Sequence, residues 1–220
     1  MSKEKVIIIG SSGHSKVIID IFEKEGTYQI IGIVDFNRSI GESVLGYPVL
    51  GPDNALPEIT KSFPGCKVFI AIGQNWLRQK VMKNILSIIP EIKFASAIHP
   101  SAQIGKSVRL GSGVAVMAGA IINSDTSIGD FTIINTNASI DHESIMEDFS
   151  SLAPNATLGG NVIIGAFSSV SINATIIQGI TIGSNTVIGA SALVTKNIGE
   201  NVVAYGIPAI IKRTRKPEDK

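Results

Sequence analysis

One histidine in this sequence stands in a setting suited to proton transfer. His142 lies between two carboxylates, Asp141 and Glu143. A carboxylate that binds one ring nitrogen fixes the imidazole tautomer and raises the basicity of the other nitrogen, as a general base requires. Gly160 follows eighteen residues later, and beside an imidazole its backbone N–H would be open to an acyl oxygen. These residues predict acyl transfer with His142 as the base; the alternative is a surface histidine with acidic neighbours.

A second candidate site lies in the N-terminal half. Residues 10–14 read Gly-Ser-Ser-Gly-His, and glycines at the start of a helix let backbone amides approach an anion. An aspartate after the next apolar run could accept hydrogen bonds from ribose or uracil. The three-glycine dinucleotide fingerprint is absent, which disfavours a hydride-transfer cofactor. This pattern predicts a nucleotide or sugar-phosphate site, although such turns also occur in sheets that bind nothing. The candidate binding residues are Ser12, Gly13, His14, Asp35 and Gly73.

The elements that must position the N-terminal group alternate between strands and helices. Three short β-branched runs predict strands at residues 6–9, 30–34 and 67–72. Apolar residues at helical spacing predict helices over residues 17–25 and 77–86, the second capped by Asn75. Such alternation predicts a small parallel sheet with helices on its faces and ligands at the carboxyl ends of its strands.

The element that must position His142 is a repeat with a period of six. From Ile98 to Val194 every sixth residue is aliphatic, over seventeen consecutive hexads, and the fifth position is small or β-branched almost throughout. This period predicts a parallel β-solenoid with triangular coils of about 18 residues. Residues 18 apart then stack, which places Gly160 beside His142. Like residues also stack at the corners: Phe131, Phe149 and Phe167; Asn137, Asn155 and Asn173.

Composition narrows the class of protein. The 220 residues accommodate one solenoid and one further domain, with the boundary at residues 97 and 98. A net charge of +1 argues against a nucleic-acid partner, and 44% hydrophobic with only 17% charged residues suggests apolar surface buried between subunits. The lone Cys66 excludes an intramolecular disulfide and fits a reducing compartment. No run of eighteen apolar residues and no signal peptide is visible, so we expect a cytoplasmic protein without membrane insertion.

Several motifs together resemble a known enzyme family. The hexapeptide solenoid, the turn at residues 10–14, the segment at residues 135–143 and the closing Gly206-Ile207-Pro208-Ala209 are similar to those of bacterial sialic-acid O-acetyltransferases and bacillosamine N-acetyltransferases. The resemblance covers essentially the whole chain. It implies an α/β Rossmann-like nucleotide-sugar-binding domain (residues 1–97) followed by an all-β left-handed parallel β-helix with a C-terminal tail (residues 98–220).

The resemblance also implies an activity and residue roles. It implies acetyl-CoA-dependent acetylation of the 4-amino group of a nucleotide-linked amino sugar, without a metal, in a homotrimer whose active sites lie between neighbouring solenoids. His142 would accept the proton, Glu143 would raise its basicity, and Gly160 would donate its N–H to the thioester carbonyl. The acetyl-CoA side of the site would include Asn135, Ser151, Gly160, Ile172 and Ala190. Ser151 is a departure, because the best-matching family members carry a second histidine there.

Three other interpretations stay open at this point. A sugar hydroxyl could replace the amine as the acceptor, with the same residues at work. A metal-dependent hydratase would need three clustered imidazoles, whereas the chain has only His14, His99 and His142. A non-catalytic scaffold would explain the solenoid but not His142 facing Gly160. The basic tail is either solvated or contacts the phosphates of the acyl carrier; its cations are Lys212, Arg213, Arg215 and Lys216.

Overall fold

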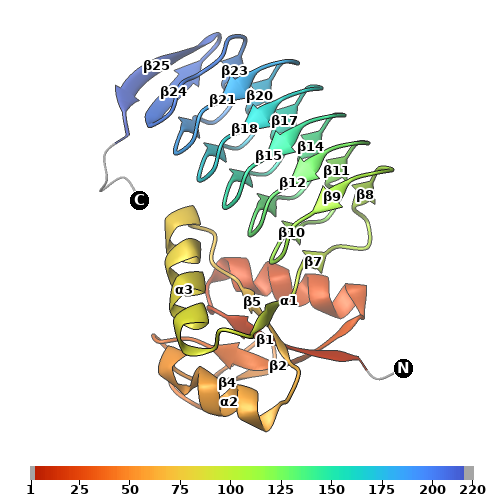
Figure 1. The fold of residues 1–220 in the computed structure, drawn as a ribbon, viewed down its shortest axis with the longest axis vertical. Helices are drawn as coiled ribbons and strands as arrows, with labels where there is room; N and C mark the ends of the chain where they lie inside the picture. Colours follow the sequence, from red (N-terminus) through yellow and green to blue (C-terminus); the bar gives the residue numbers. More distant parts are fainter. Residues whose placement is uncertain (1–2, 216–220) are drawn as a thin grey trace. The chain divides into compact units, whose positions relative to one another are not determined.

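The structure, a computed structural model, describes residues 3–215 and divides into two compact units, Met1–Pro100 and Ser101–Lys220. Lys216, the last cation of the predicted basic tail, lies outside the described residues. Each unit has its own architecture, drawn in Figure 1 in red to yellow for the first and in green to blue for the second. Within residues 3–215, no helix has both the length and the apolar composition that a membrane crossing requires.

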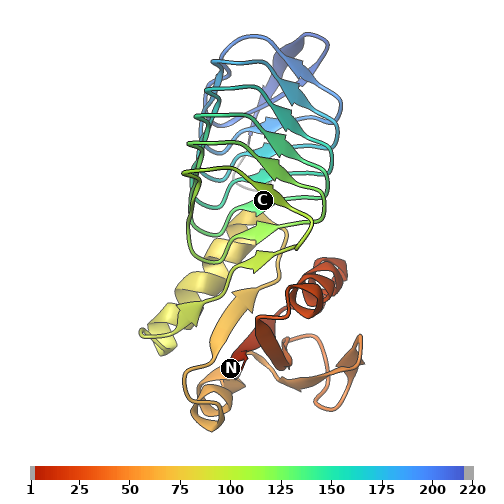
Figure 2. The same ribbon diagram turned by 90° about the vertical axis from the view of Figure 1, so that its right-hand side faces the viewer.

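The first unit is built around a six-stranded sheet. Its strand order is β3-β4-β2-β1-β5-β6, and the neighbours are parallel except for the β3–β4 hairpin. Helix α1 lies on one face of the sheet and helices α2 and α3 lie on the other, as Figure 2 shows. The elements are β1 (Glu4–Ile9), α1 (Gly13–Glu25), β2 (Tyr28–Val34), β3 (Ser43–Val44), β4 (Tyr47–Gly51), the 3-10 helix η1 (Asp53–Ala55), α2 (Leu56–Ser62), β5 (Lys67–Ile70), α3 (Asn75–Ile88), β6 (Lys93–Phe94) and β7 (Ala97–Ile98).

The predicted α/β alternation is confirmed, with three differences. β3 and β4 form in the segment where the sequence shows only turn residues, and the antiparallel β3 makes the sheet mixed rather than parallel. A further helix, α2, precedes β5. Asn75 is the first residue of α3 and not its cap, because its Oδ1 accepts a hydrogen bond from Arg78 at 2.9 Å instead of closing the helix start.

The second unit is the predicted solenoid. Its two-residue strands pair in parallel with strands eighteen residues away, for example Ser139 with Thr157 and Ile145 with Ile163. They form three sheets, in which the orders are β23-β20-β17-β14-β11-β8, β21-β18-β15-β12-β9 and β25-β24-β22-β19-β16-β13-β10. The strands are β8 (Gln103–Ile104), β9 (Arg109–Leu110), β10 (Ala115–Val116), β11 (Ile121–Ile122), β12 (Ser127–Ile128), β13 (Ile133–Ile134), β14 (Ser139–Ile140), β15 (Ile145–Met146), β16 (Ser151–Leu152), β17 (Thr157–Leu158), β18 (Ile163–Ile164), β19 (Ser169–Val170), β20 (Thr175–Ile176), β21 (Thr181–Ile182), β22 (Val187–Ile188), β23 (Leu193–Val194), β24 (Val202–Gly206) and β25 (Ala209–Thr214).

The hexad pattern explains the core of the solenoid. From Val116 to Val194 the aliphatic residue of every hexad is at most 3% exposed, whereas Ile104 in the first coil is 40% exposed. Buried hydroxyls at the fifth position are satisfied by the next coil: Ser144 Oγ donates to the carbonyl of Gly159 at 3.2 Å and accepts the N–H of Val162 at 3.1 Å. The small fifth residue therefore adds hydrogen bonds between coils as well as close packing.

The corners adopt a left-handed backbone in both the asparagine and the phenylalanine columns. Asn137, Asn155 and Asn173 have φ near 57°, and Phe131, Phe149 and Phe167 have φ from 54° to 61°. The three phenylalanine rings stack with centroids 5.1 and 5.4 Å apart. Beyond Val194, where the hexad pattern stops, β24 continues one solenoid sheet and turns back into β25 at the predicted Gly206–Ala209 turn.

Candidate active site

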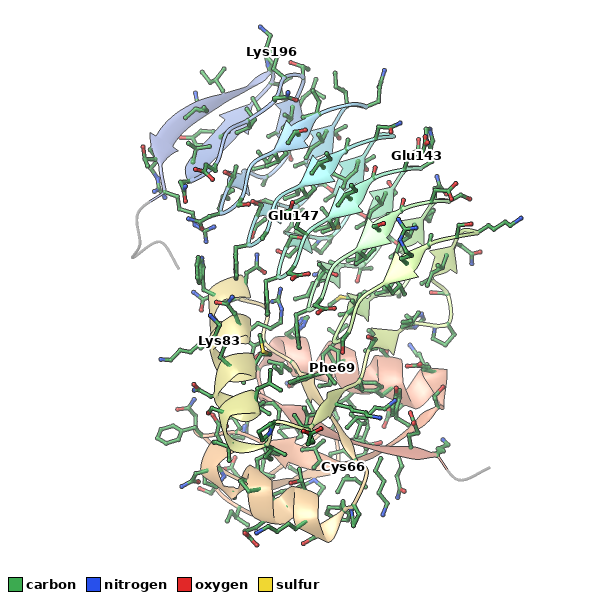
Figure 3. All side chains as sticks on the ribbon, in the orientation of Figure 1. Cys66, Phe69, Lys83, Glu143, Glu147 and Lys196 are labelled. Atoms are coloured by element: carbon green, nitrogen blue, oxygen red, sulfur yellow. The ribbon has the colours of Figure 1, made fainter. Side chains whose placement is uncertain are left out.

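His142 lies at an outer corner of the solenoid, in the turn after β14. Its Nδ1 is 3.0 Å from Oε2 of Glu143, and both side chains are more than half exposed. Figure 3 shows Glu143 projecting from the outside of the coils. Because a carboxylate only accepts hydrogen bonds, the proton sits on Nδ1 and the lone pair of Nε2 is free to accept another. The arrangement is that of a general base.

Asp141, the other acidic neighbour, has a different role. Its Oδ1 accepts the backbone N–H of His142 at 2.8 Å and the side-chain amide of Asn123 at 2.8 Å. These two hydrogen bonds, the one from Asn123 first, hold the pKa of the Asp141 carboxyl below its usual range. Asp141 therefore fixes the backbone of the corner, while Glu143 alone contacts the imidazole. The sequence did not single out Asn123, which lies one coil away.

Gly160 lies directly beside the imidazole, as the eighteen-residue register predicts. A Cβ added to Gly160 would lie 2.7 Å from Cε1 and 2.8 Å from Nε2 of His142. The two coils are joined next to this point, because the N–H of Asn161 donates to the carbonyl of His142 at 2.9 Å. The N–H of Gly160 itself makes no hydrogen bond to another described residue. Gly160 is buried beside the imidazole, and this unpaired donor next to the base is a candidate to bind an oxygen.

The other residues assigned to the acetyl-CoA side do not gather at this corner within one chain. Asn135 lies at the preceding corner of the coil, where its Oδ1 accepts the N–H of Thr136 at 2.8 Å. Ile172, half exposed, and Ala190 follow Thr136 in the same corner column, because the N–H of Ser191 donates to the carbonyl of Ile172 in the eighteen-residue register. Ser151 lies on strand β16, with its Oγ 3.3 Å from Ser169 Oγ.

In the first unit, the glycine turn leads from β1 into α1. Ser12 precedes the helix but makes no side-chain hydrogen bond that caps it, and a Cβ on Gly13 would meet no atom within 4 Å. Gly13 is exposed, and the N–H groups of Gly13 and His14 make no hydrogen bond to another described residue, whereas that of Ser15 donates to the carbonyl of Ser12 at 3.1 Å. The two unpaired N–H groups at this helix start are suited to an anion. The N–H of Gly10 donates to Val34 at 2.9 Å, which holds this turn against the end of β2.

His14 is largely buried in the first turn of α1. Burial, and secondarily the charge of Arg78, lower its pKa from 6.5 to about 4, so the imidazole is neutral at neutral pH. Its Nε2 is buried without a hydrogen-bond partner among the described residues. A buried imidazole nitrogen with no partner is a candidate to bind a ligand's hydroxyl or phosphate oxygen.

Asp35 and Gly73 follow β2 and β5 at the same edge of the sheet. The N–H of Asp35 donates to Gly51 at 3.1 Å, and its Oδ1 accepts the N–H of Asn37 at 2.7 Å. The carbonyl of Gly73 accepts a hydrogen bond from Arg78, which is 1% exposed and also bonds Ile72 and Asn75. Arg78 fixes the β5–α3 turn, and no pattern in the sequence distinguished it from a surface cation.

The sequence analysis also missed Arg38. Its Nε donates to Ser11 Oγ at 3.1 Å, and its guanidinium pairs with Glu42 at 2.9 Å. A cation is therefore held over the glycine turn that precedes α1. Its position three residues after Asp35 was the only available signal. Among residues 3–215, no group of three or more His, Cys, Asp or Glu side chains is arranged to hold a metal ion.

Comparison with known proteins supports the resemblance. The model of the PglD N-terminal domain matches residues 5–85. UDP-N-acetylbacillosamine N-acetyltransferase of Bacillus subtilis (strain 168) is 33% identical over 115 residues, which are 52% of this chain and 52% of the relative. The match thus spans about half the length of that curated relative.

Solved structures match over nearly the whole chain. A histidine variant of perosamine N-acetyltransferase from Caulobacter crescentus, in complex with CoA and GDP-perosamine, is 40% identical with a TM-score of 0.89, covering 96% of this chain and 98% of that one. The acetyltransferase domain of PglB from Neisseria gonorrhoeae FA1090, in complex with acetyl coenzyme A, is 31% identical with a TM-score of 0.88, covering 96% of this chain and 100% of that one.

This chain belongs to the sugar N-acetyltransferases with a left-handed β-helix. The family resemblance and the fold that the motifs predicted are both confirmed.

We expect Gly160→Ala to reduce acetyl transfer at least tenfold in this N-acetyltransferase. The new methyl group would overlap the imidazole of His142 and force it out of position, and a correctly placed base contributes roughly 10²–10⁴-fold. Release of the CoA thiol measures the rate, and a thermal melt checks folding. Gly199→Ala is the control, because a Cβ at Gly199 meets no atom within 4 Å. A glycine nearer to the site, Gly165, cannot serve as the control, because its Cβ would lie 2.5 Å from the backbone N of Ser184. An unchanged rate in Gly160→Ala would contradict the site geometry.

We also expect the first unit to lose stability as the pH falls from about 6.5 to about 4. In this pH range the unfolded chain binds a proton at His14 and the folded chain does not. The free energy of unfolding therefore decreases as the pH falls, by ~1.4 kcal/mol per pH unit and by up to about 3 kcal/mol in all. Urea unfolding followed by the fluorescence of Trp76, the single tryptophan, measures it. His14→Gln should flatten the pH dependence, whereas His142→Gln, in the other unit, should not. Equal slopes in His14→Gln and the parent chain would refute the assignment.

Proposed function

We propose that this chain transfers an acetyl group from acetyl-CoA to the 4-amino group of a nucleotide-linked amino-deoxy sugar. The observation that carries the proposal is the imidazole of His142, which is held by Glu143 and packs against Gly160, whose N–H makes no hydrogen bond to another described residue. Membership of the sugar N-acetyltransferases supports it, because relatives of this chain were solved with CoA and with GDP-perosamine. We further propose that the reaction takes place in the cytoplasm and serves polysaccharide biosynthesis.

In the proposed mechanism the acetyl group moves directly from sulfur to nitrogen. The sugar amine attacks the thioester carbonyl while Nε2 of His142 takes a proton from the amine nitrogen. The N–H of Gly160 donates to the carbonyl oxygen as negative charge develops there. A C–N bond forms, the C–S bond breaks, and the proton held by His142 passes to the departing sulfur. Glu143 stabilises the imidazolium in the meantime.

A covalent acyl-enzyme is not part of this proposal. Cys66, the only cysteine, is buried in the first unit, and burial raises the pKa of its thiol, which makes it a poor nucleophile. Positioning of the two substrates and the Gly160 amide then account for most of the catalysis.

We propose that the active site is completed between subunits of a homotrimer. On a single chain His142 and Glu143 are more than half exposed, whereas Asn135, Ile172 and Ala190 belong to a different corner. A neighbouring chain would bring that second corner to the first and enclose the pantetheine arm between them. Aliphatic side chains on the outside of the coils support such packing: Ile121, Ile145, Ile172 and Ile177 are between 36% and 50% exposed.

The N-terminal unit is proposed to hold the sugar nucleotide. The open helix start at Ser12 and Gly13 and the guanidinium of Arg38 would bind the diphosphate. His14 and Asp35 would bind hydroxyl or phosphate oxygens nearby, and Gly73 lies at the same edge. The curated relative is named for a UDP sugar and the solved relative holds GDP-perosamine, so the relatives alone leave the nucleotide open.

A sugar hydroxyl is the second candidate acceptor, because the same base could deprotonate it. Incubation with acetyl-CoA and UDP-, dTDP- or GDP-linked 4-amino sugars, compared with their 4-hydroxy counterparts, separates the two while thiol release is followed. If only the 4-hydroxy sugars are acetylated, the chain is an O-acetyltransferase and the proposed N-acetylation is wrong. If neither kind of sugar is acetylated, the non-catalytic scaffold is the remaining interpretation.

We expect His142→Ala to lower the turnover number roughly 10²–10⁴-fold, because the variant lacks its general base. Folding and acetyl-CoA binding should stay near normal, since an exposed corner side chain is removed without opening a core cavity. Glu143→Gln should shift the pH–rate profile as well as lower the rate. Lys196→Ala removes an exposed side chain near the C-terminal end of the solenoid (Figure 3); it is the control and should behave like the parent chain. Near-normal turnover of His142→Ala would remove His142 from the mechanism.

We expect light scattering at micromolar concentration to give three times the mass of the chain. Specific activity should fall when dilution dissociates the trimer, because each site then loses its second wall. A monomeric mass with full activity would rule out the shared site.

A further inference from the structure

The first unit contains a cavity that none of the roles above uses. It has a volume of about 250 Å³ and lies on the face of the six-stranded sheet that α2 and α3 cover. Ile9 and Val34, the last residues of β1 and β2, form part of its lining. The next residues along the chain are Gly10 of the glycine turn and Asp35. The cavity therefore begins where the proposed diphosphate and ribose contacts end.

The lining of this cavity suits one flat ring with a polar edge. Leu56 of α2 and Val81 and Ile85 of α3 supply apolar walls from two helices. Asp53 and Asn54, in the 3-10 helix η1 between β4 and α2, add a carboxylate and an amide. Pockets for drug-sized ligands measure roughly 300–1,000 Å³, so a volume slightly below that range fits a single nucleobase.

We propose that this cavity holds the base of the sugar nucleotide and that Asp53 selects guanine; the inference rests on the proposed nucleotide-sugar function. Guanine presents two adjacent donors, N1–H and its 2-amino group, which one carboxylate can accept together. Its O6 is an acceptor that the Asn54 amide can serve. Uracil and thymine present a single N–H between two carbonyl oxygens, and a carboxylate repels those oxygens.

The surroundings of Asp53 support a bidentate contact. The hydrogen bond from the Asp35 N–H to the Gly51 carbonyl, at 3.1 Å, brings the end of β2 next to the end of β4, two residues before Asp53. Partial burial and, secondarily, the charge of Asp35 raise the pKa of the Asp53 carboxyl. Within residues 3–215 the Asp53 side chain accepts no hydrogen bond. The Asp53 residue is exposed, so its two carboxylate oxygens are available to the two donors of guanine.

Arg38 provides a contrast within the same unit. It lies over the glycine turn, bonded to Ser11, and so would contact phosphate and not the base. Its contribution to affinity should be the same for every nucleoside diphosphate, whereas that of Asp53 should depend on the base.

The test is calorimetric titration of the full chain with GDP, IDP, XDP and UDP. We expect GDP to bind roughly 10–100-fold more tightly than UDP, the range of one bidentate base contact. IDP, which has no 2-amino group, should bind at least tenfold more weakly than GDP.

A substitution at Asp53 should strengthen the binding of one nucleotide, XDP, and weaken that of another, GDP. Asp53→Asn replaces one of the two acceptors by a donor, which matches xanthine, whose 2-oxo group stands where guanine has its 2-amino group. We expect this variant to bind GDP roughly 10–100-fold more weakly and XDP more tightly than the parent chain. Glu58→Gln, the same change of charge at an exposed position of α2, should alter neither. Arg38→Ala should weaken GDP and UDP by the same factor.

The outcomes separate this inference from the proposed function. If UDP binds as tightly as GDP, or if Asp53→Asn keeps the parent's preferences among GDP, IDP and XDP, guanine selection is overturned while nucleotide-sugar binding stands. If none of the four nucleotides binds, both guanine selection and the nucleotide role of this unit are wrong. Tighter XDP binding by Asp53→Asn would itself show that the variant is folded.

Discussion

The coil length of eighteen residues is the constraint on which the catalytic corner depends. His142 and Gly160 are neighbours only because each coil hydrogen-bonds to the next in that register, as the bond from Asn161 N–H to the His142 carbonyl at 2.9 Å shows. The register in turn follows from aliphatic side chains that fill the interior at every sixth position. Any change that shifts one coil against the next would separate His142 from Gly160 without altering either residue.

The corner conformation supplies the second requirement. Glu143 has φ of 57°, a left-handed backbone that glutamate seldom adopts, whereas Asn161 and Gly179 fill the next places in its column. A strained residue persists where the surrounding structure fixes it, and here the coils on both sides do so. The consequence is that the Glu143 carboxylate reaches Nδ1 of the preceding residue. Asp141 has the same charge but an ordinary backbone, and it binds the main chain instead.

The repeat made the second unit predictable from sequence. The aliphatic hexads predicted the strands, the stacked phenylalanines and the pairing of His142 with Gly160, because in a periodic structure a sequence interval is also a spatial one. The first unit offers no such rule. Arg38 and Arg78 owe their positions to the lengths of particular loops, and Asp53 belongs to a cavity that exists only once α2 and α3 pack on the sheet. The helix cap predicted at Asn75 was wrong for the same reason, because Arg78 engages its side chain.

The two units also stabilise their polar groups in different ways. In the solenoid, buried hydroxyls such as Ser144 and Ser168 bond to carbonyls of the adjacent coil, so each polar group is satisfied within a repeating pattern. In the first unit, the guanidinium of Arg78 is almost completely buried against backbone carbonyls, and burial lowers its pKa to about 9. The free-energy cost of burying this charge is offset by its hydrogen bonds to the carbonyls of Ile72 and Gly73, in the turn that follows β5. This turn lies at the edge of the sheet where a ligand is expected.

The triangular coil limits how such a chain can change in length. A hexad is one side of the triangle, so inserting or deleting eighteen residues adds or removes a whole coil and leaves every later side chain facing its former direction. A change of six residues keeps the aliphatic interior intact but turns everything that follows by one side. Between His142 and Gly160 it would preserve a stable solenoid while bringing a different residue to the base. An insertion of eighteen residues between them would separate His142 from Gly160 in the same way, so the interval between these two residues is fixed in length, whereas whole coils can be added or removed elsewhere in the solenoid.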